Sequence, residues 1–285
     1  MRKNAKMKTR NVIIAVASVL VLTGISVAAY IGGSYYFHQK DVERVVGSIE
    51  ERINQNQVEE LSTTTPVNKE TTTAPKDKEK TESTGNTGKT EHTYSGNKDN
   101  NSKNFSADSV DVQKLREDSL KYNEALKSNQ SSKLVGEKSY SYAALDLTKY
   151  GIYDNTYGYV SAPTIGMKLP IYLGVTEGNM AYGAAHFCYT SLPTGGESTN
   201  VVLAGHTGYI GRWLFDSISN LSIGDEVDVN TYIGSLKYKV VSIKRKLPTE
   251  SDDIYIERGK DKLTMVTCTY ASDGTYMRYI VICER

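Results

Sequence analysis

Two apolar segments of this sequence each end on a residue that can take part in nucleophilic catalysis. Residues 201–206 read VVLAGH and deliver His206, and residues 263–268 read LTMVTC and deliver Cys268. A thiol and an imidazole at the ends of buried strands have fixed backbones and exposed side chains, as nucleophilic catalysis requires. We predict that Cys268 and His206 form a catalytic pair.

A third candidate, Arg278, lies ten residues after Cys268 at the start of the last β-rich run, YMRYIVIC. If the strands that carry Cys268 and Arg278 are antiparallel neighbours, the loop between them returns the guanidinium to the thiol. A guanidinium is always charged, so it can stabilise an oxyanion without exchanging protons. The alternative is a surface arginine on a hairpin, which is the ordinary position for this residue type.

The N-terminus has the composition of a membrane anchor. The first eleven residues, MRKNAKMKTRN, contain five Lys or Arg and no acid, and Val12 to Ile31 contains no charge. Twenty such residues span a bilayer as a helix, and this length favours an uncleaved anchor over a cleaved signal peptide. Basic residues stay on the cytoplasmic side, so we expect a single-pass protein whose chain lies outside the cell from about Gly32.

The three cysteines, Cys188, Cys268 and Cys283, are an odd number for a protein outside the cell. At least one of them cannot form an intramolecular disulfide. We expect Cys188 and Cys283 to be small buried side chains, which is the usual place of a free cysteine. Cys268 is then the thiol that needs a chemical explanation.

Composition divides the chain into three parts. Residues 1–33 are the basic tail and the anchor, and residues 34–108 are a short amphipathic helix over 42–53 followed by a polar, flexible spacer. Only the C-terminal half is rich enough in apolar residues to bury a core, so 109–285 is predicted to be one folded domain. The net charge of +1 gives no case for a nucleic-acid partner.

The folded part is predicted to be mainly β. A helix is expected after residue 109, because Val112, Leu115, Ser119, Tyr122 and Leu126 share one stripe and Ser109 or Asp111 can cap its start. A second, around Arg212 to Ser219, is expected to turn Trp213, Leu214 and Ile218 inward. Short β-rich runs predict an all-β barrel or sandwich. These runs cover 157–162, 167–173, 201–204, 226–230, 236–243, 263–267 and 278–283.

The candidate residues and their surroundings resemble the sortase family. The segment TMVTC is similar to the Thr-Leu-x-Thr-Cys signature of that family, with Met265 in place of Leu, and Gly205-His206 and Arg278 match its other two elements in order and spacing. Residues 186–215, HFCYTSLPTGGESTNVVLAGHTGYIGRWLF, resemble class C, or pilin-type, sortases. So do KLPIYLG at 168–174 and SIGDEVDV at 222–229.

This resemblance implies a closed eight-stranded β-barrel with short helices, preceded by an N-terminal helix. It implies a cysteine transpeptidase in which Cys268 attacks the Thr-Gly bond of a Leu-Pro-x-Thr-Gly-like sorting signal, His206 protonates the leaving amine, and Arg278 holds the substrate and the oxyanion. The acceptor would be a pilin lysine or a cell-wall peptide of a Gram-positive bacterium. Thr267 would shape the site, and His186 would pack in the barrel near it.

Two departures concern the subclass. Many class C sortases carry an Asp-Pro-aromatic lid motif, but no proline occurs between Pro75 and Pro163, so a lid is either missing or built from residues 138–159. Many also carry a second, C-terminal membrane helix, whereas this sequence stops at Arg285 after the last strand. Pilin assembly is therefore favoured only modestly over the anchoring of surface proteins to the wall.

Other readings of the sequence stay open. We expect no cofactor, although Glu250, Asp252, Asp253, Glu257 and Asp261 lie in one loop that could bind calcium, and His186, Cys188, His206 and Cys268 are four ligand types for zinc. A hydrolytic cysteine protease would use the same Cys268 and His206 but accept water. A catalytically idle, wall-spanning adhesion module would need the anchor and the spacer but not the thiol.

Overall fold

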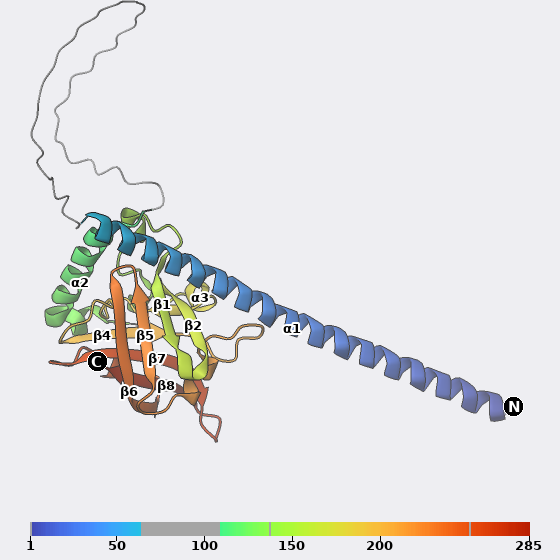
Figure 1. The fold of residues 1–285 in the computed structure, drawn as a ribbon. Helices are drawn as coiled ribbons and strands as arrows, with labels where there is room; N and C mark the ends of the chain where they lie inside the picture. The colour runs from blue at the N-terminus through green and yellow to red at the C-terminus, as the bar shows by residue number, and fades with distance from the viewer. Residues whose placement is uncertain (1, 64–108, 137, 251) are drawn as a thin grey trace, which may run out of the picture.

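The β-rich runs of the C-terminal half close into a barrel of eight strands (Figure 1). The computed structural model describes residues 2–63, 109–136, 138–250 and 252–285, so most of the predicted spacer lies outside the described residues. The strands follow the order β1-β2-β3-β4-β7-β8-β6-β5 around the barrel, which confirms the predicted architecture. In chain order they are β1 (Thr156–Ala162), β2 (Met167–Leu173), β3 (Ala184–His186), β4 (Thr199–Ala204), β5 (Glu226–Thr231), β6 (Gly234–Lys246), β7 (Asp261–Tyr270) and β8 (Tyr276–Glu284).

Helices lie outside this barrel and in its connections. The α-helices are α1 (Arg2–Thr63), α2 (Val112–Lys133) and α3 (Glu177–Met180), and the short 3-10 helices are η1 (Ser139–Ser141), η2 (Leu147–Tyr150), η3 (Pro163–Ile165), η4 (Phe215–Asn220) and η5 (Asp252–Ile254). In the barrel, β2 pairs with β3 and β4 pairs with β7 in parallel, and the other neighbours are antiparallel. The parallel pair β4 and β7 positions the candidate catalytic residues.

Strand β7 corrects one of the predictions. It does not stop at Thr267 but continues to Tyr270, so Cys268 lies within the strand rather than just past its end. The extension forms because residues 268–270 pair with residues 276–278 of β8 across a short hairpin. Cys268 is therefore held by a ladder on the side that faces β8, which fixes its backbone more firmly than a loop would.

The N-terminal helix α1 is one continuous helix, and the short helix expected over 42–53 is its C-terminal part. Val42, Val46 and Ile49 are buried in the same core as the barrel residues, so this part of α1 packs on β1 and β2. Figure 1 shows the blue N-terminal part projecting away from the barrel. In the described residues, the helical segment Ile13–Asn56 contains the one stretch long and apolar enough to cross a membrane.

Helix α2 forms where the apolar stripe predicts it. Asp111 caps its start by accepting a hydrogen bond from the backbone N–H of Lys114 at 3.0 Å, which satisfies one of the free donors of the first turn. Asn123 is buried on the stripe, and its amide group donates to the carbonyl of Leu192 and accepts from its N–H, each at 2.8 Å. These two bonds tie α2 to the connection between β3 and β4.

The expected helix around Arg212 to Ser219 is the 3-10 helix η4, and Trp213 does not face inward. Leu214 and Ile218 are buried as predicted, but the Trp213 side chain is exposed. The buried ring of Phe215 fills the interior position instead. Trp213 lies before the start of η4, in the loop that leads to it, so a helical spacing does not set the direction of its side chain.

Candidate active site

Parallel pairing brings His206 and Cys268 to the same end of two neighbouring strands. Ala204 of β4 is paired with Val266 of β7, and each candidate lies two residues further along its own chain. The register continues past the end of β4, because the N–H of Gly205 donates to the carbonyl of Val266 at 3.2 Å. The predicted position of His206 just after the end of its strand is therefore confirmed, and it lies beside β7 at the level of Cys268.

Gly205 makes the turn to His206 possible. A Cβ atom at this position would lie only 2.5 Å from the Phe215 ring, so the buried aromatic side chain leaves no room for one. The backbone N–H of Phe215 also donates to the carbonyl of His206 at 2.9 Å. Glycine is therefore required before His206 for packing, because the Phe215 ring occupies the space of a side chain at position 205. The same ring fixes the position of the His206 backbone.

Cys268 and Arg278 are direct partners in the antiparallel ladder of β7 and β8. The Nη1 atom of Arg278 donates to the Sγ atom of Cys268 at 3.0 Å, as expected if the two strands are neighbours. A cation at this distance can stabilise the oxyanion that forms next to the sulfur after attack on a carbonyl. Two of the three predicted residues are therefore in contact.

Tyr276 is a further member of this group that the sequence did not reveal. Its hydroxyl lies 2.9 Å from Sγ of Cys268 and accepts a hydrogen bond from Nη1 of Arg278 at 2.7 Å. Tyr276 lies two residues before Arg278, so both side chains point to the same face of β8. Burial, followed by the contact with Cys268, raises the pKa of the Tyr276 phenol, so it stays protonated at neutral pH.

Of the three thiols, Cys268 is the accessible one. Its strand neighbour Thr267 and the core residue Met265 face the barrel interior, so Cys268 faces outward and is partly exposed. Cys188 and Cys283 are free and buried, as predicted. Burial raises the pKa of the Cys283 thiol to about 12, which removes its thiolate at neutral pH.

His206 has a buried ring nitrogen that lies beside a carboxylate. Its Nε2 lies 3.3 Å from Oε1 of Glu177 in α3, close enough for an ion pair when the ring is protonated. Nε2 is buried and has no hydrogen-bond partner in the described part of the chain. The ring packs against Tyr209 with 5.3 Å between centroids. These contacts orient the imidazole, and no sequence pattern pointed to Glu177.

Thr267 joins the two strand ends below the candidate pair. Its Oγ1 donates to the carbonyl of Gly205 at 2.7 Å and lies 2.6 Å from Oγ1 of Thr207. Gly205 and Thr207 flank His206, so the buried threonine holds the histidine turn against the strand that carries Cys268. This geometry supports the predicted site-shaping role, with the side chain acting through the backbone of its neighbours.

His186 is buried at the end of β3 but bonds to the connection after β3 rather than to the other candidates. Its Nε2 lies 2.9 Å from the carbonyl of Ser191, and because a carbonyl only accepts, Nε2 carries the proton. Nδ1 is buried without a partner among the described residues. Burial lowers the pKa of His186 to about 4, so the ring is neutral when the protein is folded.

The neutral His186 predicts a pH-dependent loss of stability. The folded pKa of about 4 lies below the ordinary value of 6.5, so the unfolded chain binds more protons between these values and stability falls as the pH drops through this window. At pH 5 the expected loss from this one residue is about 2 kcal/mol relative to pH 7. Urea unfolding at pH 7 and pH 5 measures it, with His186→Gln as the comparison. An equal loss in both proteins would show that His186 is not the cause.

The predicted acidic loop is already paired with cations. Asp253 lies 2.6 Å from Lys244 and 2.8 Å from Lys246, and Asp261 lies 2.9 Å from Arg285. These lysines and the arginine compete with a metal ion for the carboxylates. In the ranges that the structure covers, no three His, Cys, Asp or Glu residues are grouped to hold a metal, and the zinc alternative stays untested. Calcium binding stays a prediction.

The Tyr-rich stretch over 138–159 packs beside the candidate site. The ring of Tyr140 lies 5.1 Å from that of Phe187, and its carbonyl accepts from the N–H groups of Val175 and Cys188, each at 3.1 Å. Together these residues cover the outer face of β3 and of Ala204, next to the His206 turn. This stretch is the alternative source of a lid predicted from the sequence, and the structure places part of it next to the His206 turn.

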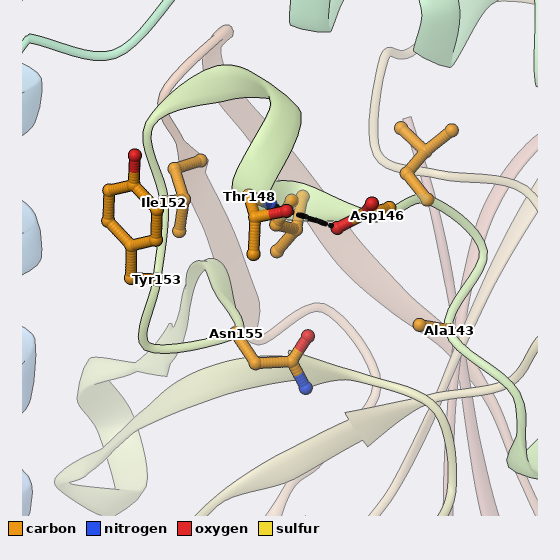
Figure 2. Close-up of a pocket in the computed structure, with 8 residues that line it drawn as sticks. Ala143, Asp146, Thr148, Ile152, Tyr153 and Asn155 are labelled. Atoms are coloured by element: carbon orange, nitrogen blue, oxygen red, sulfur yellow. Dashed lines mark hydrogen bonds between the residues drawn. The ribbon is translucent and has the colours of Figure 1, made fainter.

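A pocket of about 300 Å³ lies in the 143–155 segment (Figure 2). Asp146 lines it, but its carboxylate is used to cap η2, because it accepts from Oγ1 of Thr148 at 2.6 Å and from its N–H at 3.2 Å. None of the predicted site residues lines the pocket. It has no nucleophile and no free charge with which to extend the candidate site.

Comparisons with known proteins agree with this geometry. Residues 160–285 match the model of the sortase domain. Sortase A of Bacillus anthracis is 29% identical over 124 residues, which are 44% of this chain and 57% of that protein, so the match spans little more than half of the curated relative.

The alignments with two solved structures span most of the solved chains. The Group B Streptococcus Pilus Island 1 sortase C2 is 31% identical, with 60% of this chain and 97% of that chain aligned and a TM-score of 0.51. The Clostridium perfringens sortase C with the C-terminal cell wall sorting motif is 32% identical, with coverages of 61% and 88% and a TM-score of 0.50. The eight-stranded barrel, the order of its candidate residues and these likenesses lead to one conclusion: the chain belongs to the sortase family.

Proposed function

We propose that this protein is a membrane-anchored cysteine transpeptidase that cleaves Leu-Pro-x-Thr-Gly-like sorting signals between Thr and Gly and joins the acyl product to an amine. The observation that carries the proposal is the 3.0 Å contact between Nη1 of Arg278 and Sγ of Cys268, with His206 at the end of the neighbouring parallel strand. A nucleophile, an oxyanion donor and a proton-transfer group at one place are the parts that acyl transfer needs.

In the first half of the reaction, the thiol proton of Cys268 passes to His206, Sγ bonds to the threonine carbonyl carbon, and the π electron pair of the carbonyl moves onto its oxygen. Arg278 donates to this oxyanion. When the pair returns, the carbon–nitrogen bond breaks, and protonated His206 gives its proton to the leaving glycine amine. The product is a thioester on Cys268.

In the second half, an amine attacks the thioester carbonyl. The carbon–sulfur bond breaks, Sγ leaves as a thiolate, and the attacking nitrogen loses a proton to His206. The likeness to sortase C structures supports a pilin lysine as the acceptor. The missing Asp-Pro-aromatic motif supports a cell-wall peptide as the second candidate, so the test must include both amines.

Mass spectrometry of the enzyme mixed with a sorting-signal peptide and candidate amines tests the proposal. We expect a new amide whose mass is the acyl fragment plus triglycine or plus a lysine peptide, and the faster of the two names the acceptor class. Release of the free acid alone, at the same rate with and without amines, would identify a hydrolytic cysteine protease. An uncleaved peptide would favour a structural module.

For localisation, we propose that Val12 to Ile31 of α1 spans the cell membrane, with the basic N-terminus inside and the barrel outside, facing the wall. The long apolar helix and the five basic residues before it support this orientation. The barrel then lies on the side where wall precursors and sorting signals are exposed. Partners are the sorting-signal protein, the amine acceptor and the lipid bilayer.

A further inference from the structure

Apolar side chains are exposed on the loop that follows His206. This loop, residues 207–214, connects β4 to η4, and Ile210 and Trp213 on it are 75% and 59% exposed. Tyr36 and Phe37 of α1 are exposed as well. Removing such apolar side chains from water is favourable, so each of them is a candidate for contact with an apolar phase.

Direct contacts fix the 207–214 loop to α1. The Trp213 ring lies 5.6 Å from the Tyr35 ring, and Gly211 packs so closely on Ser34 that a side chain at that position would overlap it. Gly211 also has a φ of +82°, which other residues rarely adopt. The loop therefore meets the helix at residues 34 and 35.

Arg212 ties the loop to the connection between α3 and β3 and to Tyr209 of the loop itself. Its guanidinium donates to the carbonyl of Ala181 and stacks over the rings of Tyr182 and Tyr209, with 4.6 Å and 5.1 Å to the centroids. Stacked and hydrogen-bonded guanidinium groups hold a loop in one position. Ile210 and Trp213 are therefore held at a fixed distance along α1 from the apolar segment Val12 to Ile31.

That distance places the loop at the membrane surface. Twenty helical residues, Val12 to Ile31, cover about 30 Å, which is the thickness of the hydrocarbon core. Residues 34 and 35 follow about 5 Å further along the unbroken helix, within the headgroup layer. Tryptophan and tyrosine are enriched at this depth because their rings are apolar and carry one polar group.

We propose that the 207–214 loop docks on the outer leaflet of the membrane that α1 spans, with Ile210 and Trp213 at the boundary of headgroups and acyl chains. The inference rests on the proposed span of α1. Because the loop begins directly after His206, docking holds the candidate site at a set height above the bilayer. A protein substrate that is itself embedded in the membrane is then met at the same height.

The single tryptophan of the chain allows a direct test. The full-length protein is reconstituted in phosphatidylcholine and phosphatidylglycerol vesicles, with and without lipids brominated on the acyl chain near the headgroup. We expect Trp213 emission to fall at least two-fold with the brominated lipids, and less with bromines deeper in the chain. Ile210→Asp is expected to reduce this quenching.

The matched control moves the tryptophan to the far end of the contact with α1. In Tyr153→Trp on a Trp213→Phe background, the new reporter replaces an exposed ring next to Asp154, which pairs with Arg52, about 30 Å along α1 from Ile31. Its emission should not change. Protein that floats with the vesicles but shows unquenched Trp213 overturns the docking alone, and protein that does not float overturns the anchor as well. Trp213 emission that is unquenched by the brominated lipids but changes with the protein-to-lipid ratio points to a second copy on the patch and also overturns docking.

A second inference concerns Tyr276 and stands on different contacts. A guanidinium only donates, so the phenol oxygen accepts from Arg278 and its own proton points to the remaining neighbour, Sγ of Cys268. When Sγ bonds to a carbonyl carbon, its charge moves to an oxygen one atom further away. The geometry points to Tyr276 as a second oxyanion donor beside Arg278. The phenol of Tyr276 keeps its proton throughout the reaction.

Replacing one hydroxyl tests this role. Tyr276→Phe should lower kcat by roughly 10- to 100-fold with KM nearly unchanged, since the hydrogen bond is strongest in the transition state. Tyr270→Phe is the control. Tyr270 is paired with Tyr276 in the ladder of β7 and β8, the two ring centroids are 5.6 Å apart, and the Tyr270 side chain is exposed. A Tyr276→Phe enzyme within two-fold of wild type, or a faster one in which the phenol had only masked the thiol, overturns the inference.

Discussion

Cys268→Ala is expected to abolish cleavage of a Leu-Pro-x-Thr-Gly peptide, with a loss of more than roughly 10⁴-fold in kcat/KM. Arg278 and His206 can polarise a carbonyl and move a proton, but without Sγ no covalent intermediate forms. The side chain is small and partly exposed, so its loss leaves no large cavity. The thermal unfolding midpoint should stay within a few degrees of wild type.

Cys188→Ala is the matched control for the nucleophile. Cys188 is also a free thiol, but it is buried, and burial raises its pKa. We expect its activity within about three-fold of wild type, since a buried neutral thiol takes no part in the reaction. Appreciable cleavage of the peptide by Cys268→Ala would show that Cys268 is not the nucleophile. Loss of cleavage in Cys188→Ala at unchanged stability would also contradict the assignment.

Arg278→Ala is expected to have the second-largest effect, a decrease of about 10²- to 10³-fold in kcat/KM. The variant removes the cation 3.0 Å from Sγ and leaves the phenol of Tyr276 without its donor. Arg278→Lys should recover only part of the activity, because one ammonium group cannot copy the planar fork that contacts both neighbours. Steady-state kinetics with the same peptide measures both variants.

Arg245→Ala controls for the loss of a surface guanidinium. Arg245 lies on β6, the strand on the other side of β8, and stacks on Tyr279 with 5.6 Å to the ring centroid. It should keep wild-type kinetics within about two-fold. Arg278→Ala that kept kcat/KM within a few-fold of wild type would exclude the guanidinium as the main oxyanion donor.

The three candidate residues could be predicted from the sequence because the patterns that indicate them lie within short segments. An apolar run that ends on Gly205-His206 and another that contains Cys268 are visible in the order of residues alone, and ten residues are enough for a hairpin that returns Arg278 to the thiol. Pairing of β7 and β8 then follows from β-rich composition on both sides of a turn. Most strands could be predicted for the same reason.

The remainder depends on contacts between distant segments. Tyr276 is one of 21 tyrosines, and it becomes distinctive only when the Cys268–Arg278 pairing is known, because alternate residues of β8 then share the face of the thiol. Glu177 approaches His206 through a four-residue helix that has no periodic pattern. Strand β3 has only three residues and gives no alternation to detect.

Trp213 shows why a correct element can still carry a wrong side-chain direction. The apolar spacing of residues 213–218 suggested an inward-facing helix, but Phe215 takes the interior place against Gly205. The tryptophan is left on the outside, beside Tyr35 of α1. The ring's contact with α1, which packs on the barrel from far away in the sequence, is what the proposed membrane docking rests on.

Trapping the covalent intermediate tests the central claim most directly. The wild-type enzyme is mixed with a sorting-signal peptide in the absence of added amine, quenched in acid within seconds, and digested for mass spectrometry. The account predicts the acyl mass on the fragment that contains Cys268, in thioester linkage that neutral hydroxylamine removes. Cleavage of the peptide with no such adduct, or with the acyl mass on a fragment containing Cys188 or Cys283, would contradict it.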